Sequence, residues 1–73
     1  MYRYSFILID PQGLISHTQV GELPSVEHAL QLAEVITHEL SIDPDHRWAG
    51  WTIEVRDKHG EVLAVKPVPA AAA

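Results

Sequence analysis

Five histidines are the residues of this chain with the clearest capacity for chemistry: His17, His28, His38, His46 and His59. Imidazole binds zinc and exchanges protons near neutral pH. Two ligands on one helix must lie three or four positions apart, whereas His28 and His38 are separated by about 15 Å along a helix axis. Glu34 and His38 have the right spacing, but they fall on the polar face of the predicted helix. We therefore expect a solvated pair there and no metal site within one chain.

Ser25 directly precedes the predicted helix, where a serine caps the free backbone amides of the first turn. A nucleophilic serine of the α/β-hydrolase type lies in a Gly-x-Ser-x-Gly segment, and no such segment surrounds this residue. The four glycines are not grouped, so phosphate-loop and dinucleotide-binding fingerprints are absent as well. We therefore predict no enzyme activity, no catalytic residue and no bound cofactor.

Trp48 lies in a polar segment shortly before Trp51. In one interpretation Trp51 anchors the core at the start of a strand, and Trp48 folds down over its edge. In the other, Trp48 anchors a binding partner, because tryptophan is enriched among the residues that dominate binding energy. The sequence leaves both interpretations open.

A length of 73 residues allows one hydrophobic core and therefore one domain. We assign residues 1–68 to a single α+β domain and residues 69–73 to a flexible C-terminal tail, because Pro67 and Pro69 end the last strand. A domain of this size buries only about 60% of the surface of its unfolded chain, so its own core gives marginal stability. Burial against another chain would increase that stability.

The formal net charge is −5, and the five cationic side chains are dispersed along the chain. A protein of this charge repels a phosphate backbone, so we expect no nucleic-acid partner. The apolar run at residues 6–9 is too short for a signal peptide or a membrane span. The chain contains no cysteine, which suits a reducing compartment. These features predict a cytoplasmic protein with no membrane partner.

The first hairpin is predicted from a β-rich run at Tyr2–Asp10 and the turn sequence Asp10-Pro11-Gln12-Gly13. A three-residue loop with a bulge at the glycine pairs Asp10 with Leu14. This register puts Tyr4, Phe6, Leu8 and Val20 on the inner face, and Ile7, Ile9, Ile15 and His17 on the outer face. The outer face is more apolar than a solvent-exposed surface requires.

The helix is predicted over Val26–Leu40, directly after the cap at Ser25. Apolar residues recur at helical spacing and form one stripe: Val26, Ala29, Leu30, Ala33, Ile36 and Leu40. Leu32 and Val35 fall beside this stripe and widen it into a shoulder. The shoulder is apolar surface beyond what one small core uses.

The second hairpin is predicted from the alternating run Trp51–Asp57, a turn at residues 57–60, and a return strand at Glu61–Val68. The turn geometry pairs Val55 with Leu63 and Ile53 with Val65 on the inner face, and it leaves Lys66 outside, diagonal to Glu54. The resulting order is ββαββ. We predict an α+β fold in which a four-stranded antiparallel sheet carries one helix on one face.

Three segments are distinctive: YRYSF at the start, GELPSVEHALQLA at the beginning of the helix, and WTIEVRDKHGEVL in the second hairpin. Together they resemble a family of small bacterial single-domain proteins, a domain of unknown function. The resemblance covers the chain up to about Pro67. Its residues start a helix and close a turn, so it implies a fold rather than an activity.

Apolar side chains that one subunit cannot bury predict self-association. The candidate interface residues are Ile7, Ile9, Ile15, His17, Leu32, Val35 and Trp48. Burial of one aliphatic side chain contributes about 1.5 to 3 kcal/mol, a large amount for a marginally stable domain. The sequence therefore predicts a non-enzymatic protein–protein interaction module, a homodimer formed through the outer faces or edges of its sheets.

Two alternative functions fit the same chain. One is an antitoxin-like regulatory domain, whose negative charge suits a basic partner protein. The other is a small-ligand or metal sensor in which His17 and His28 meet across a dimer. A third interpretation is structural: with a shifted hairpin register, the isoleucines would belong to the core.

Overall fold

The computed structural model describes residues 1–45 and 47–69 of the chain. Its elements are β1 (Tyr2–Ile9), β2 (Ile15–Leu23), α1 (Val26–Ser41), β3 (Thr52–Arg56) and β4 (Val62–Pro67). The bounds predicted from the sequence for β1, α1, β3 and β4 agree with these within one residue at each end. His46 and most of the predicted tail, residues 70–73, lie outside the described residues.

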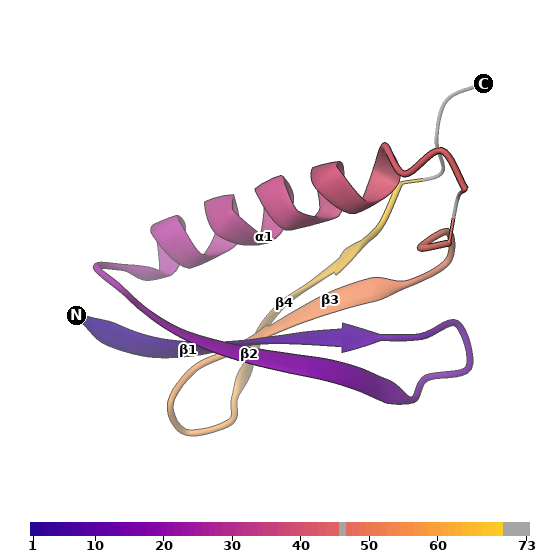
Figure 1. Ribbon diagram of the computed structural model, residues 1–73. Coiled ribbons are helices and arrows are strands. Elements are labelled where there is room, and N and C mark those ends of the chain that lie inside the picture. The colour runs from indigo at the N-terminus through magenta and orange to yellow at the C-terminus, as the bar shows by residue number, and fades with distance from the viewer. Residues whose placement is uncertain (46, 70–73) are drawn as a thin grey trace.

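The four strands form one sheet in the order β2-β1-β3-β4, and every neighbouring pair is antiparallel. Because β2 and β3 each run antiparallel to β1, they are parallel to each other. Helix α1 connects them and lies over one face of the sheet, while no described element covers the other face (Figure 1). These observations confirm the predicted α+β fold and its ββαββ order.

Both hairpins are closed by the same aspartate turn. In the first hairpin, Asp10 Oδ1 accepts hydrogen bonds from the amides of Gln12 (3.0 Å) and Leu14 (2.8 Å). Gly13 follows with φ at 88°, in the left-handed region that glycine adopts without steric cost. The corresponding residues of the second hairpin are Asp57, His59, Glu61 and Gly60. The turn chemistry predicted from the sequence is therefore correct in both hairpins.

A bulge just beyond the first turn shifts the register of β1 and β2. Ile9 pairs with Ile15, as predicted. The next residue of β1, Leu8, pairs with His17, so Ser16 is an extra residue on β2. A shift of one residue turns every later side chain to the opposite face.

The predicted faces of β2 are consequently wrong from His17 onward. Val20 was expected on the inner face, but it pairs with Ser5 of β1 and lies on the outer face. His17 was expected on the outer face, but it pairs with Leu8 and lies on the face that α1 covers. The positions of Ile7, Ile9 and Ile15 on the outer face are unaffected.

The second hairpin contains a matching bulge. Arg56 pairs with Val62 and Val55 pairs with Ala64, so Leu63 is the extra residue. The predicted pairs of Val55 with Leu63 and of Ile53 with Val65 are therefore wrong. Val65 pairs instead with Glu54 and lies on the outer face.

Lys66 is also on the opposite face from the one predicted. It pairs with Ile53 in the register and reaches the helix, where its Nζ lies 3.0 Å from Glu34 Oε1. This ion pair joins β4 to α1 at a partly exposed position, so its contribution to stability is modest. Glu54 forms its ion pair with Arg56 rather than approaching Lys66.

The core lies between α1 and the inner face of the sheet. Its buried residues are Tyr4, Phe6, Ala29, Ala33, Ile53 and Val55, and the partly buried residues around them are Leu8, Leu23, Ile36, Leu40 and Leu63. Ala29 and Ala33 are 0% exposed, because two small side chains let the helix approach the sheet closely. Thr37 continues this row and is also buried, although the predicted stripe did not include it. Val26, which the stripe did include, is 42% exposed.

Candidate interaction surface

The outer face of the sheet is the surface opposite α1. The strand register assigns to it Arg3, Ser5, Ile7 and Ile9 of β1, Ile15, Thr18, Val20 and Glu22 of β2, Thr52, Glu54 and Arg56 of β3, and Val62, Val65 and Pro67 of β4. Six of these side chains are aliphatic and come from three strands. The bulges of both hairpins contribute to this composition, since they turn Val20 and Val65 outward.

Exposure separates the aliphatic residues of the outer face into two groups. Ile15, Val20 and Val65 are 60%, 55% and 55% exposed, and Val62 is 48% exposed. Ile7 is only 6% exposed, because it lies on a central strand between Thr18 and Glu54. Ile7 is thus on the predicted face but is already covered by its own chain. The apolar surface open to a partner lies toward the β2 and β4 edges.

The charges of the outer face balance one another. Glu54 forms an ion pair with Arg56 on β3. Arg3 and Glu22 are directly opposite each other in the register of β1 and β2. The face therefore carries two carboxylates and two guanidinium groups, although the chain as a whole has a net charge of −5. The acidic excess lies on the other surfaces of the molecule.

The helix shoulder is a second exposed apolar surface. Leu32 and Val35 are 37% and 53% exposed, as their places beside the buried stripe predicted. Leu32 lines a groove between α1 and β2, whose two hollows have volumes of about 170 and 180 Å³. His17 lines the same groove, with Phe6 and Leu8 beneath it. Of the predicted interface residues, His17 and Leu32 are thus on the helix side of the sheet, separated from the isoleucines.

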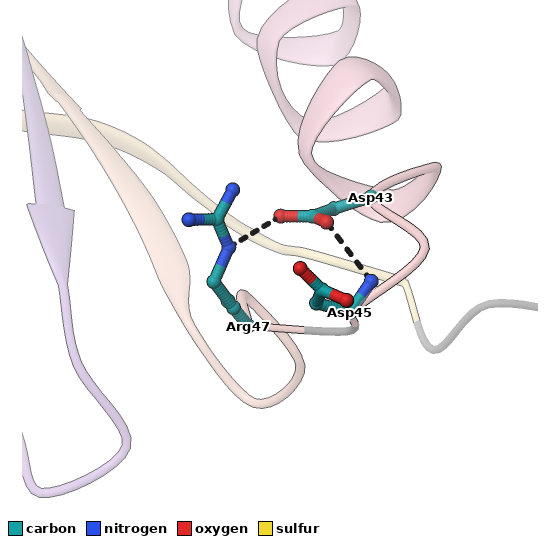
Figure 2. A network of polar contacts seen from close by, with 3 residues as sticks. All are labelled: Asp43, Asp45 and Arg47. Carbon is teal, nitrogen blue, oxygen red and sulfur yellow. Dashed lines mark hydrogen bonds and ion pairs between the residues drawn. The ribbon is translucent and has the colours of Figure 1, made fainter.

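Trp48 is in the loop between α1 and β3. Its ring makes an edge-to-face contact with Trp51, with ring centroids 5.0 Å apart, and Trp48 is half-buried. The same loop is held by Asp43, which accepts from the Asp45 amide at 3.0 Å and from Arg47 Nε at 2.9 Å (Figure 2). The contact with Trp51 favours the interpretation in which Trp48 covers its neighbour.

The histidines and acidic residues of the described ranges, residues 1–45 and 47–69, form no group of three or more that could hold a metal ion. Glu34, which the sequence places one turn before His38, is engaged with Lys66. No helix in the described part of the chain is long and apolar enough to cross a membrane.

Comparisons with curated proteins and with solved structures gave no match. The model of one protein family, described as "Domain of unknown function (DUF6894)", matches residues 3–69. The match includes the helix and the four strands of the fold described above, apart from Tyr2, the first residue of β1. The chain therefore belongs to the family of the domain of unknown function DUF6894.

Proposed function

We propose that this protein is a non-enzymatic interaction module that acts as a homodimer, in which the outer faces of two sheets pack about a two-fold axis. The supporting observation is a sheet face that no element of the described residues covers, on which Ile15, Val20 and Val65 are each more than half exposed. The lack of cysteine suits the cytoplasm as the place where the module acts.

The size of the outer face is compatible with a stable contact. The molecule measures 38 × 22 × 15 Å, so its broad side sets an upper limit of roughly 800 Å² for this face, close to what each partner contributes to a standard interface. Each of the four exposed aliphatic side chains, Ile15, Val20, Val62 and Val65, would add about 1 kcal/mol or more when its open half is buried. Such gains are substantial for a chain of 73 residues, which has a small core of its own.

Charge favours a second copy of this chain as the partner. Two chains of net charge −5 repel each other in general, but the balanced outer face lets them meet without opposing like charges. In a two-fold contact, Arg56 and Glu54 of one copy can also face their counterparts in the other. A basic partner protein would instead select an acidic surface, and the outer face is neutral.

Light scattering after size-exclusion chromatography tests this proposal with two matched variants. Val20 and Val35 have nearly equal exposure, 55% and 53%, but Val20 is on the outer face and Val35 is on the helix. At about 10 to 100 µM we expect the wild type to have twice the chain mass of 8.1 kDa. Val20→Lys should give the monomer mass, because the lysine places a charge in the contact, and Val35→Lys should remain dimeric.

A monomeric wild type over the same concentration range would contradict the proposal. A monomeric Val35→Lys together with a dimeric Val20→Lys would also contradict the proposal, because the contact would then lie on the helix shoulder. Circular dichroism of both variants shows whether they are folded, which separates lost association from lost structure. Ile7→Lys is a poor test, because Ile7 is 6% exposed and the variant would disturb the subunit itself.

A further inference from the structure

A cavity of about 350 Å³ opens where the beginning of α1, the start of β1 and the β3–β4 turn meet. Its lining residues are Tyr2, Arg3, Tyr4, Ser25, Val26, Asp57, Lys58, His59 and Leu63. The cavity is on the helix side of the sheet, so it is separate from the outer face. Its volume is at the lower end of the range for small-molecule sites, which is about 300 to 1,000 Å³.

Tyr4 supplies an unused hydrogen-bonding group to this cavity. The residue is 4% exposed, and its ring belongs to the core. Its hydroxyl has no hydrogen-bond partner among the described residues. Every fully buried side-chain oxygen or nitrogen of the described residues does have a partner, so the Tyr4 hydroxyl is not fully buried. The hydroxyl must therefore reach the solvent, and the cavity is the hollow that Tyr4 lines.

The first turn of α1 adds backbone donors at the same place. The Ser25 hydroxyl accepts from the His28 amide, so the amides of Val26 and Glu27 are left without an intrahelical acceptor. These amides carry the partial positive charge of the helix terminus, and Val26 lines the cavity. The site thus combines the accessible, unpaired hydroxyl of a largely buried tyrosine with an uncompensated helix terminus.

The cations of the chain reinforce this pattern. Arg47, Arg56 and Lys66 form ion pairs with Asp43, Glu54 and Glu34, respectively. The other two cations, Arg3 and Lys58, have no ion pair among the described residues. Lys58 lines this cavity, whereas Arg3 borders it from a strand position whose side chain belongs to the outer face. In a chain with a net charge of −5, one unpaired cation, Lys58, therefore lies at this hollow.

We infer that this cavity binds a small organic anion, a carboxylate or phosphate carried on an apolar body. The anionic group accepts hydrogen bonds from the Tyr4 hydroxyl and the Val26 amide and is attracted by Lys58. The apolar body packs against the side chains of Tyr2 and Leu63. Asp57 also lines the cavity, but its Oδ1 is occupied by the amides of His59 and Glu61.

Titration of the isotope-labelled full-length chain, followed by two-dimensional ¹H–¹⁵N spectra, tests this inference. Benzoate and phenyl phosphate supply the charge with an apolar body, benzyl alcohol supplies the body without charge, and inorganic phosphate supplies the charge alone. We expect saturable shifts of the amides of Val26, Glu27 and Lys58 with benzoate or phenyl phosphate below about 10 mM. Benzyl alcohol and inorganic phosphate should bind several-fold more weakly.

Variants distinguish this site from general attraction of anions. Tyr4→Phe removes only the hydroxyl, and Lys58→Ala removes one charge from an exposed turn, so each should weaken binding about threefold to tenfold. Arg47→Ala removes an equal charge at the opposite end of α1 and should leave binding unchanged.

Either of two results would overturn the inference: no saturable shift with any of the anions, or equal affinities for Tyr4→Phe, Lys58→Ala and the wild type. Preferential binding of benzoate over phenyl phosphate shows that the site favours a carboxylate, and the reverse shows that it favours a phosphate. The outcome is independent of self-association, because the cavity and the outer face are on opposite sides of the sheet.

Discussion

The Ser25 hydroxyl makes two contacts at the beginning of α1: it accepts from the His28 amide at 3.3 Å, and it lies 2.8 Å from His28 Nδ1. A hydroxyl has one donor and two acceptor sites, so the same oxygen can accept from the amide and also form a hydrogen bond with Nδ1. One serine thereby satisfies an amide of the first turn and fixes the orientation of an exposed imidazole. At this scale the sequence was sufficient, since a cap needs only neighbouring residues.

Ser25→Ala is expected to lower the free energy of unfolding by about 1 kcal/mol, the usual cost of losing a serine cap. Urea unfolding at a fixed protein concentration measures it. Ser41→Ala is the matched control, because the Ser41 hydroxyl donates to the His38 carbonyl at the other end of α1 and caps no amide. An equal loss in both variants would contradict a specific capping role for Ser25.

The hairpins show what local sequence decides at the scale of elements. The aspartate and glycine of each turn fix the loop, and the pairs nearest the turn, Ile9–Ile15 and Arg56–Val62, are those predicted. The bulges at Ser16 and Leu63 carry no comparable signal in the sequence. In the second hairpin, Leu63 is the bulged residue of β4 and has no partner on β3. It packs against the core beside Ala64.

Gly60→Ala is expected to lower the free energy of unfolding by about 1 to 2 kcal/mol, the cost of an L-residue in the left-handed region. Nothing within 4 Å would meet the added methyl group, so the loss would come from the backbone with φ at 80°. Gly21→Ala is the control, because its new Cβ would make an ordinary contact of 4.0 Å with Phe6. Thermal unfolding should show a lower midpoint for Gly60→Ala and little change for Gly21→Ala.

At the scale of the whole molecule, one helix on one side of a four-stranded sheet leaves the other side without a covering layer (Figure 1). Two-layer folds bury one face of each element, so the outer face is where an additional layer would pack. A second copy supplies that layer in the proposed dimer, and the two sheets would then form the interior of a four-layer assembly.

Unfolding of such a dimer depends on protein concentration. A tenfold increase in concentration should add about 1.4 kcal/mol per dimer to the apparent free energy of unfolding, because unfolding releases two chains. Denaturant titrations at two concentrations of the wild type measure this shift. The unfolding midpoint of Val20→Lys should be the same at both protein concentrations. A wild type whose midpoint is also unchanged between them would contradict dimeric folding.

The site was predicted only in part, for a physical reason that lies in the register. Ile9 and Ile15 were placed correctly because they are close to the turn that aligns them. Val20 and Val65 were missed, and His17 was placed on the wrong face, because one bulge inverts every residue beyond it. The hollow that Tyr4 lines was not foreseen either, since it joins residues from three elements that are distant in the sequence.

The sequence by itself determined the helix cap, the turns, the bounds of α1, β1, β3 and β4, and the ββαββ order, because each depends on residues a few positions apart. Only the tertiary structure decided the strand order, the two bulges and therefore which side chains lie on the outer face. Those features depend on the close packing of the helix against the sheet at Ala29 and Ala33. They also depend on which strand register buries the most apolar surface under the helix. Packing is a property of all the elements together, so no local pattern encodes it.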